Sequence, residues 1–401
     1  MKRVLFSVLA SCLLISMLAG CADDIIVDSG DSDTEPFVSD SGTEFVSDSI
    51  TDDVTDEDEK KDEDTDGEVK EKVKFRFYSL HKNEEYFKYN GRMQHIADGV
   101  SCDFTASGIE FSGIMKGDLH LLLECSDDTY FTVFVDGVRQ NERIFANKDT
   151  KRVKIATFAG EAEHSVRIIK QSEAQRSISL LKAISMTGYL YEAPKERDYF
   201  IEVIGDSITC GYGNLGTKAE GSDGTALWED GTQAFPFLTA EALGADCSVI
   251  GCSGIGVQKG YSAVTEKDFY IQWCRYRNTN NPYNFKAARV PDIVVINLGT
   301  NDKSTGATEA EFKTEVKYLI NYVRTAYGQN VPVIWTYNMM GNGCFDWVKP
   351  VLAEMGGESA GLYYVELNQN QEGGGGHPLA SAHKTAANTL SSFIRTKNIL
   401  K

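Results

Sequence analysis

The second half of the chain carries the feature that most constrains its fold: short apolar runs rich in β-branched residues, separated by helical patterns. The runs cover residues 200–204, 247–250, 292–298, 331–337 and 362–367. Continuous apolar strands of this kind are typical of a parallel sheet that is buried on both faces. One intervening segment has its apolar residues at helical spacing: Phe312, Val316, Leu319, Ile320 and Val323. Residues 196–401 are therefore predicted to form a three-layer α/β/α domain with a parallel sheet, and its chemistry is expected where the strands end.

Residues 73–195 show a different pattern, in which short runs alternate between apolar and polar residues. These runs cover residues 74–78, 108–112, 119–124, 130–135, 153–158, 165–170 and 178–187. Turns such as Asp136-Gly137 separate them, which predicts an all-β, jelly-roll-like sandwich. Four of the six histidines lie in this region: His81, His95, His120 and His164. Their separations match no metal-ligand spacing, so we expect scattered surface or turn histidines and no metal site.

The N-terminus has the pattern of an export signal. Lys2 and Arg3 precede an apolar run over residues 4–18, and the sequence Leu-Ala-Gly then leads into Cys21. The run is short for a membrane-spanning helix, which needs about 20 residues. Small residues directly before a cysteine resemble the bacterial lipobox. We predict a lipoprotein signal over residues 1–21 with lipidation at Cys21; the alternative is an ordinary signal in which this cysteine is incidental.

Most of the negative charge lies in one segment. The chain has 40 Lys and Arg against 59 Asp and Glu, and residues 22–72 alone hold 21 acidic residues against 4 Lys. With few large apolar residues, this segment is predicted to be a disordered, self-repelling linker. Calcium capture is the alternative, although no Gly-punctuated calcium loop is present. The overall charge excludes a phosphate-neutralising basic surface, so nucleic acid is not an expected partner.

Cysteine spacing indicates neither a disulfide framework nor a zinc cluster. Beyond the N-terminal segment seven cysteines remain, with no CxxC pair. We expect most of them to be buried free thiols.

Three predicted strands end in residues suited to acyl transfer. Ser207 follows the first strand in Gly205-Asp206-Ser207, where a sharp turn can raise it as a nucleophile; its alternative role is to cap the next helix. Gly254 follows the second strand and Asn301 the third, so that a glycine amide and a side-chain amide can meet a developing oxyanion beside the Ser207 amide. Turn geometry at Gly254 and an Asx-turn at Asn301 remain open.

A serine hydroxyl needs a base, and histidine is the usual one. The α/β region contains only His377 and His383. His377 follows four glycines and precedes Pro378 and the last predicted helix, residues 379–397, so it is the predicted base. His383 lies inside that helix, where we expect a surface residue.

These four blocks, in this order from Gly205 to Pro378, resemble those of the SGNH (GDSL-type) hydrolase superfamily. The resemblance implies that Ser207 is the nucleophile, that His377 is the base, and that Gly254 and Asn301 complete the oxyanion hole. Residues 106–111, 135–137 and 163–170 of the β region are similar to carbohydrate esterase family 2. That family's members are secreted or modular enzymes that remove acetyl groups from plant cell-wall polysaccharides.

The sequence departs from the superfamily pattern at one position. Gly374 stands where an acidic residue usually orients the histidine. Family 2 includes Ser-His dyads whose histidine is held by a backbone carbonyl, and Glu372 is the alternative partner. For substrate binding we single out Trp347 and Tyr337 as aromatic platforms, together with Asp206; a core role for Trp347 remains open.

The predicted function is that of a lipid-anchored, cell-surface carbohydrate esterase that removes O-acetyl groups from xylan or glucomannan through an acetyl-enzyme. Its expected partner is an acetylated polysaccharide or oligosaccharide. Contact with the membrane is expected only through the lipid anchor at Cys21. No cofactor is expected. The alternatives are a non-catalytic glycan-binding lipoprotein and an SGNH esterase that acts on a lipid or on peptidoglycan O-acetyl groups.

Overall fold

A computed structural model describes residues 73–400 apart from residues 221–223, 262–264, 266–269, 271–281 and 342. All the described residues belong to one compact unit, Glu68–Lys401. The predicted signal segment, with Cys21, and the predicted linker over residues 22–72 lie outside the described residues. None of the described helices combines the length and the apolar character needed to cross a membrane.

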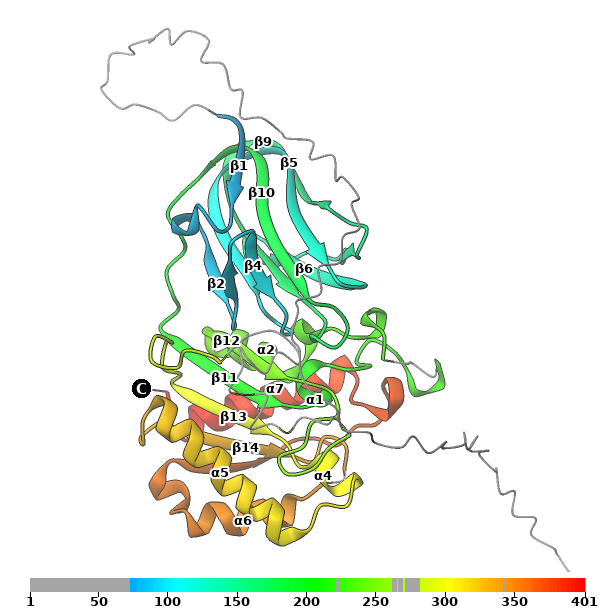
Figure 1. The fold of residues 1–401 in the computed structure, drawn as a ribbon, viewed down its shortest axis with the longest axis vertical. Helices are drawn as coiled ribbons and strands as arrows, with labels where there is room; N and C mark the ends of the chain where they lie inside the picture. Colours follow the sequence, from blue (N-terminus) through cyan, green and yellow to red (C-terminus); the bar gives the residue numbers. More distant parts are fainter. Residues whose placement is uncertain are drawn as a thin grey trace, which may run out of the picture. The chain divides into compact units, whose positions relative to one another are not determined.

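The first part of this unit is a ten-stranded antiparallel sheet, called the β domain here (Figure 1). Its path runs β3-β4-β10-β5-β9-β6-β7; β1 pairs with β10, β2 with β5 and β8 with β6. The strands are β1 (Lys74–Ser79), β2 (Lys88–Asn90), β3 (Gln94–Ile96), β4 (Gly99–Cys102), β5 (Gly108–Cys125), β6 (Thr129–Val135), β7 (Val138–Arg139), β8 (Ile144–Ala146), β9 (Arg152–Lys170) and β10 (Ser179–Leu190), and the 3-10 turn η1 (Glu84–Tyr86) follows β1.

Two strands of the β domain are longer than the sequence pattern indicates. Residues 108–112 and 119–124 fall within β5, and residues 153–158 and 165–170 fall within β9. The segments expected to be turns pair with each other instead, with Met115 opposite Ala162 and Gly117 opposite Phe158. A register shift between Met115 and Gly117 marks a bulge there. Figure 1 shows these strands curving, and the sheet forms a half-barrel around its own apolar core.

The second part is a five-stranded parallel sheet with helices on both faces, called the α/β domain here. The strand order is β12-β11-β13-β14-β15. Its strands are β11 (Tyr199–Gly205), β12 (Ala245–Gly251), β13 (Ile293–Asn297), β14 (Val333–Tyr337) and β15 (Leu362–Glu366). Its helices and turns are α1 (Ser207–Cys210), η2 (Lys218–Glu220), η3 (Ala226–Trp228), η4 (Gly231–Gln233), α2 (Phe235–Leu243), α4 (Thr300–Ser304), α5 (Glu309–Tyr327), α6 (Phe345–Glu354), η5 (Gly357–Ala360), η6 (Gly374–Gly376) and α7 (Ala380–Thr396).

Two apolar clusters cover the two faces of the parallel sheet. Helices α5 and α6 contribute to one cluster, and α2 and α7 contribute to the other. The predicted helix face from Phe312 to Val323 is buried on α5. The predicted fold class, an all-β domain followed by a three-layer α/β/α domain, is therefore confirmed.

The expectation for His383 was wrong, whereas that for the cysteines held. His383 is fully buried on α7, and its Nδ1 accepts a hydrogen bond from the backbone amide of Phe235 at 3.2 Å. The reason is that α7 packs against α2, so this side of the helix meets protein instead of solvent. The six cysteines within the described residues are free and buried.

The strand order locates the site. β11 lies between β12 and β13, and Gly205 at its end pairs with Gly251 on one side and Asn297 on the other. The next strand, β12, is added on one side of β11, and the strands from β13 onward are added on the other side. Parallel sheets bind ligands beyond the carboxyl ends of their strands at such a switch point.

Candidate active site

Ser207 is the first residue of α1, directly after β11, and is 7% exposed. The Asp206 carboxylate accepts a hydrogen bond from the Ile208 amide at 3.0 Å and so caps the short helix. Glycine is required just before this pair, because a Cβ on Gly205 would lie 1.9 Å from the Thr209 hydroxyl oxygen. The strand can therefore turn directly into α1 and carry the serine to the sheet edge.

His377 meets this serine. The distance between His377 Nε2 and Ser207 Oγ is 2.8 Å, across 170 positions of sequence. The glycine run before the histidine forms the turn η6, and the Gly374 amide donates to the Gly213 carbonyl at 2.8 Å. Gly213 has a φ of +64°, and a Cβ there would lie 2.4 Å from the Gly374 oxygen. Glycines on both segments thus permit the close contact that brings the imidazole to Ser207.

No carboxylate among the described residues is hydrogen-bonded to the imidazole. His377 Nδ1 is buried and bonds to no side chain there, and the carbonyls of Gly374 and Gly375 lie near enough to the ring to act on it. The Glu372 side chain is exposed, and this residue's carbonyl accepts from the Lys218 amide. The ring instead packs on Tyr212, at 4.3 Å between centroids and 36° between planes, and the Arg176 guanidinium lies 5.2 Å from the Tyr212 ring centre.

Burial lowers the pKa of His377 from 6.5 to about 4. The carbonyls of Gly375 and Gly374 oppose this shift, and the positive charge of Arg176 adds to it. The imidazole is therefore neutral at physiological pH, which is the form that accepts a proton.

Of the two further candidates, Gly254 lies on the loop after β12 and Asn301 is the second residue of α4, which follows β13. Gly254 has a φ of +80°, and neither its amide nor the amide of Ser207 donates to another residue in the described part of the chain. The Asn301 side chain is 8% exposed, and its Nδ2 donates to the Ile255 carbonyl at 2.9 Å and to Asp206 Oδ2 at 3.1 Å. The loop after β12, the capping aspartate and α4 are thus tied together.

Two buried aspartates support this arrangement. Asp206 is 1% exposed, and burial raises its pKa to about 7. Its hydrogen bonds to Ile208 and Asn301 favour a structural role, and a contact with substrate remains a prediction. Asp302 accepts three backbone amides, from residues 257, 258 and 259, which holds the loop beyond Gly254.

A loop of the β domain, residues 171–177, also reaches this edge. Glu173 is fully buried and accepts hydrogen bonds from the Ser253 amide at 2.6 Å and the Ser253 hydroxyl at 2.5 Å. It pairs with Arg176 at 3.1 Å. The Gln175 side-chain amide donates to the Ser253 carbonyl at 2.7 Å. The same loop therefore holds the residue before Gly254 and supports the ring that packs on His377.

Sequence reasoning missed this loop, and no motif in it marks the role. Glu173 and Ser253 are 80 positions apart and belong to different domains. Only a spatial contact connects them.

The two aromatic candidates are half-buried and have aromatic neighbours. Trp347 packs edge-on against Phe312, at 5.8 Å between centroids, and Lys303 Nζ lies 4.7 Å from its ring centre. Tyr337 stacks on Tyr364 at 4.2 Å and 9°. One face of Tyr337 is thus already covered, and sugar stacking by either residue remains a prediction.

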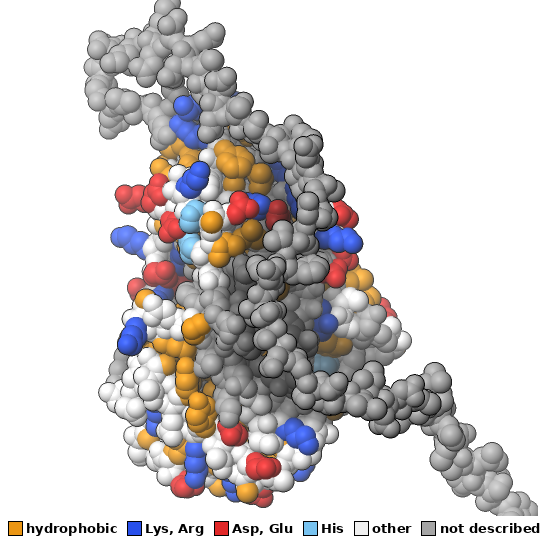
Figure 2. All heavy atoms as spheres, viewed as in Figure 1, with side chains coloured by type: hydrophobic (Ala, Val, Ile, Leu, Met, Phe, Trp, Pro, Cys, Tyr) orange, Lys and Arg blue, Asp and Glu red, His pale blue; other side chains and the backbone are white. Residues whose placement is uncertain are grey.

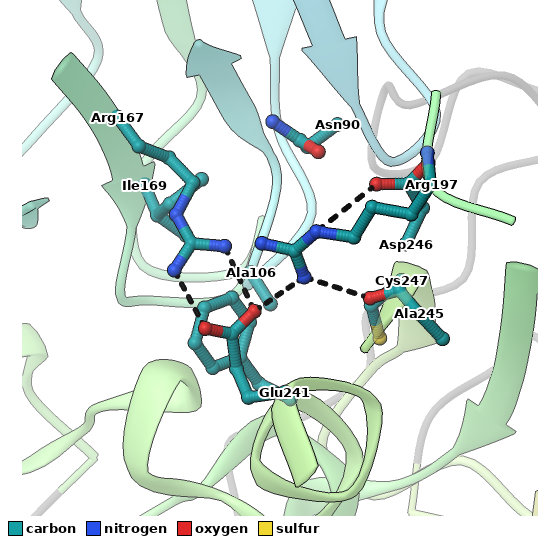
Figure 3. Close-up of a pocket in the computed structure, with 10 residues that line it drawn as sticks. Asn90, Ala106, Arg167, Ile169, Arg197, Glu241, Ala245, Asp246 and Cys247 are labelled. Atoms are coloured by element: carbon teal, nitrogen blue, oxygen red, sulfur yellow. Dashed lines mark hydrogen bonds and ion pairs between the residues drawn. The ribbon is translucent and has the colours of Figure 1, made fainter. Parts of the chain in front are cut away.

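The enclosed pocket in Figure 3 is a separate feature at the opposite edge of the sheet. It lies where the β domain meets the amino end of β12 and is lined by Arg167, Arg197, Glu241 and neighbouring residues. Both arginines bind Glu241, at 2.7–2.8 Å. Its volume is about 10 Å³, room for about one water molecule. The pocket is a small gap in the interface between the two domains, and it is too small to be a substrate cleft.

Comparison with protein-family models decides the family. A model described as Carbohydrate esterase 2 N-terminal matches residues 89–194, and a model described as GDSL-like Lipase/Acylhydrolase matches residues 201–390. The chain thus combines a carbohydrate esterase family 2 N-terminal domain with a GDSL-type hydrolase domain. The predicted resemblance is thereby confirmed, and the chain carries the domain pair of a carboxylic ester hydrolase.

Individual relatives agree with this assignment. Cellulase/esterase CelE of Acetivibrio thermocellus is 31% identical over 77% of this chain, and the match spans 39% of that protein's length. An acetylxylan esterase / glucomannan deacetylase of Cellvibrio japonicus is 25% identical over 79% of this chain and 90% of that protein. The solved structure of a family two carbohydrate esterase from Clostridium thermocellum in complex with cellohexaose superposes with a TM-score of 0.72, at 29% identity, over 78% of this chain and 99% of that one.

Proposed function

We propose that the chain is a Ser-His carbohydrate esterase that removes O-acetyl groups from plant cell-wall polysaccharide, with xylan or glucomannan as the substrate. The observation that carries the proposal is the 2.8 Å contact between Ser207 Oγ and His377 Nε2 at the switch point of the sheet. The names of the Cellvibrio japonicus relative and the cellohexaose complex of the Clostridium thermocellum enzyme support a polysaccharide substrate.

In the first half-reaction, Ser207 Oγ attacks the acetyl carbonyl carbon while its proton passes to His377 Nε2. The carbonyl oxygen becomes an oxyanion, which accepts hydrogen bonds from the backbone amides of Ser207 and Gly254. When the tetrahedral intermediate collapses, the imidazolium returns the proton to the departing sugar oxygen. This step releases the free sugar hydroxyl and leaves an acetyl-enzyme.

In the second half-reaction, His377 takes a proton from water, and the resulting nucleophile attacks the acetyl carbonyl. The oxyanion forms on the same donors, and its collapse returns the proton to Ser207 and releases acetate. No other reactant is consumed.

Asn301 is the proposed third oxyanion donor. Its Nδ2 already donates to Ile255 and to Asp206, so one of these bonds must open or be shared when the oxyanion forms. The bond to Asp206, at 3.1 Å, is the longer of the two. Asn301 therefore both holds the site together and contributes to catalysis.

Positioning of the imidazole falls to ring packing on Tyr212 instead of to a carboxylate. The carbonyls of Gly374 and Gly375 favour the protonated ring, and burial disfavours it. Losing an orienting carboxylate costs serine hydrolases orders of magnitude in rate. We therefore expect a modest turnover.

The decisive experiment measures acetate released from acetylated xylan and glucomannan, together with hydrolysis of an aryl acetate. Ser207→Ala should abolish both activities, and Asn301→Ala should lower kcat by about 10²–10³. Full activity of the Ser207 variant would refute the Ser-His assignment. A chain that retains insoluble glycan but releases no acetate would be a non-catalytic binder, and faster release from octanoate than from acetate esters would indicate a different acyl donor.

The N-terminal proposal is independent of the chemistry. Residues 1–21 are proposed to be a lipoprotein signal, and Cys21 an acylated anchor from which the acidic segment over residues 22–72 extends to the folded domains, residues 73–195 and 196–401. One acyl chain binds membranes weakly, whereas several anchor a protein stably. Cys21→Ala should move the full chain from the membrane fraction to the soluble fraction. Retention of the variant in the membrane would contradict the anchor.

A further inference from the structure

The β domain carries another group of chemistry-bearing side chains, from elements that contribute nothing to the site at Ser207. Histidine side chains lie beside acidic ones on the face shown in Figure 2. Among the described residues, His81, Glu84 and His95 each have one potential ligand atom within 4.8 Å of those of the other two. They come from the turn after β1, the start of η1 and the middle of β3.

A surface ion pair explains only part of this group. His95 Nδ1 lies 2.9 Å from Glu84 Oε1, a contact that needs no third residue. His81 takes no part in this ion pair. Its Nδ1 is a buried atom without a hydrogen-bond partner in the described part of the chain. A buried ring nitrogen with no partner, on a residue grouped with a carboxylate and a second imidazole, is a feature that a bound cation can explain.

The backbone already holds the three ligands in place. The turn that carries His81 is closed by two hydrogen bonds, from the Asn83 amide to the Ser79 carbonyl at 2.9 Å and from the Ser79 amide to Asn83 Oδ1 at 3.0 Å. The Tyr89 ring packs edge-on against His95 at 4.6 Å. The Tyr89 hydroxyl donates to the Leu80 carbonyl at 2.8 Å, so this ring ties β3 to the turn.

The donor set selects the class of ion. Two imidazoles and one carboxylate suit Zn²⁺ and related transition metals, whereas Ca²⁺ and Mg²⁺ prefer oxygen ligands alone. Bonds of about 2.0–2.1 Å place tetrahedral ligand atoms about 3.4 Å apart. Ligand atoms that lie within 4.8 Å of one another reach this spacing by shifts of about 1 Å, which the side chains can make because Glu84 and His95 are exposed.

We propose that His81, Glu84 and His95 bind one Zn²⁺ ion, with water as the fourth ligand. The ion would join the turn after β1 to β3 and so stabilise this part of the β domain. The proposal does not rest on the esterase function, since none of these residues contacts the Ser207 site.

The test titrates Zn²⁺ into chelator-treated full-length protein by calorimetry and records the visible absorption of the Co²⁺ form. We expect one Zn²⁺ per chain with a micromolar or lower Kd, a tetrahedral Co²⁺ spectrum, and a higher unfolding temperature when Zn²⁺ is present. His81→Gln and His95→Gln should each raise Kd at least tenfold. The exposed Glu84→Gln change, which leaves the fold undisturbed, should do the same.

His164→Gln is the matched control. His164 Nδ1 pairs with Asp136 at 2.8 Å on the same domain, which is the same type of contact without a second imidazole. This variant should keep the wild-type Kd. No binding at 100 µM Zn²⁺ would overturn the proposal. So would binding that survives all three ligand substitutions, because the ion would then lie elsewhere, for example on the acidic segment over residues 22–72. Aryl-acetate hydrolysis should be the same with and without Zn²⁺, so the result is read independently of the esterase assignment.

Discussion

Glu173→Gln tests whether the β domain positions the catalytic groups. The substitution keeps the size of the side chain and removes its charge. The wild-type carboxylate accepts two hydrogen bonds from Ser253 and pairs with Arg176. A glutamine has one acceptor oxygen, so its NH₂ group must face either the Ser253 donors or the guanidinium. One of these two contacts is therefore lost.

The other acidic partner of Arg176, Glu229, compensates only in part. Glu229 lies 3.4 Å from Arg176, and burial, with the nearby charge of Glu173, raises its pKa to about 8. In the variant the charge of Glu173 is gone, so one cause of this raised pKa is removed and Glu229 can pair with Arg176 more readily, although burial still opposes its ionisation. Hydrogen bonds to charged groups contribute about 1.5–3 kcal/mol each, and breaking a buried pair costs about 3–5 kcal/mol. We expect the free energy of unfolding to fall by about 2–4 kcal/mol.

The catalytic effect distinguishes positioning from simple stabilisation. If Ser253 moves, the Gly254 amide moves with it, and if Arg176 moves, the Tyr212 ring loses its support beneath His377. We expect kcat for an aryl acetate to fall by about 10–100-fold with little change in KM, since misplacement of reacting groups by about 1 Å has effects of that size. Steady-state kinetics at pH 7 and urea unfolding measure the two effects on the same samples.

Glu241→Gln is the matched control. This carboxylate also joins the two domains, through Arg167 and Arg197, but at the opposite edge of the sheet (Figure 3). It should lose comparable stability and keep its kcat. If Glu173→Gln keeps kcat within about twofold while losing stability as the control does, then the loop over residues 171–177 only joins the domains, and the positioning argument fails.

Three further outcomes follow from the site. Because burial lowers the pKa of His377 to about 4, kcat/KM should stay near its plateau at pH 5.5, where a base of pKa 6.5 would be only about 10% neutral; an acid limb centred near pH 6.5 contradicts this. Burial also lowers the pKa of His383 to about 3. The unfolded chain therefore binds a proton that the folded chain does not, and stability should decline as the pH falls from 6.5, by about 1 kcal/mol per pH unit; this decline should be shallower in His383→Asn when urea midpoints are compared. Gly205→Ala should impair both folding and hydrolysis, because its Cβ would lie 1.9 Å from the Thr209 hydroxyl oxygen. Gly244→Ala, with a positive φ but open space around it, should lose stability only.

The strand ends could be predicted because their chemistry is local in sequence. Ser207, Gly254 and Asn301 each follow an apolar run within a few residues, and parallel strands bring such positions to one edge. His377 could be selected because the α/β region holds only one other histidine. The structure brings His377 to Ser207 and places Gly254 on the loop after β12 and Asn301 in α4, after β13.

The rest depends on contacts that no local pattern encodes. His383 was expected at the surface because helical periodicity does not reveal what packs against the second side of a helix. The sequence near Gly117 predicts a turn, because it does not show that this part of β5 pairs with β9 through a bulge. His81, Glu84 and His95 converge only because β3 folds back beside the turn after β1. Their spacing along the chain therefore resembled no ligand motif.

The predicted boundary near residue 195 lies between β10 and β11, and side chains pack across it. Arg92 of the β domain is 2% exposed, and its Nη2 lies 3.3 Å from Glu202 on β11. Its guanidinium lies 4.6 Å from the Tyr270 ring centre, and the Tyr270 hydroxyl donates to Glu202 at 2.6 Å. The only cation that pairs with Glu202 within the described residues thus comes from the other domain.

Arg92→Met should lower the free energy of unfolding by about 3–5 kcal/mol, because it leaves a buried carboxylate uncompensated. Adding Glu202→Gln removes that charge and should recover part of the loss. Urea unfolding of the two variants measures both effects. A single cooperative transition in each would show that the domains unfold together, whereas an early transition confined to one domain, with no recovery in the double variant, would show that the boundary divides two independent units.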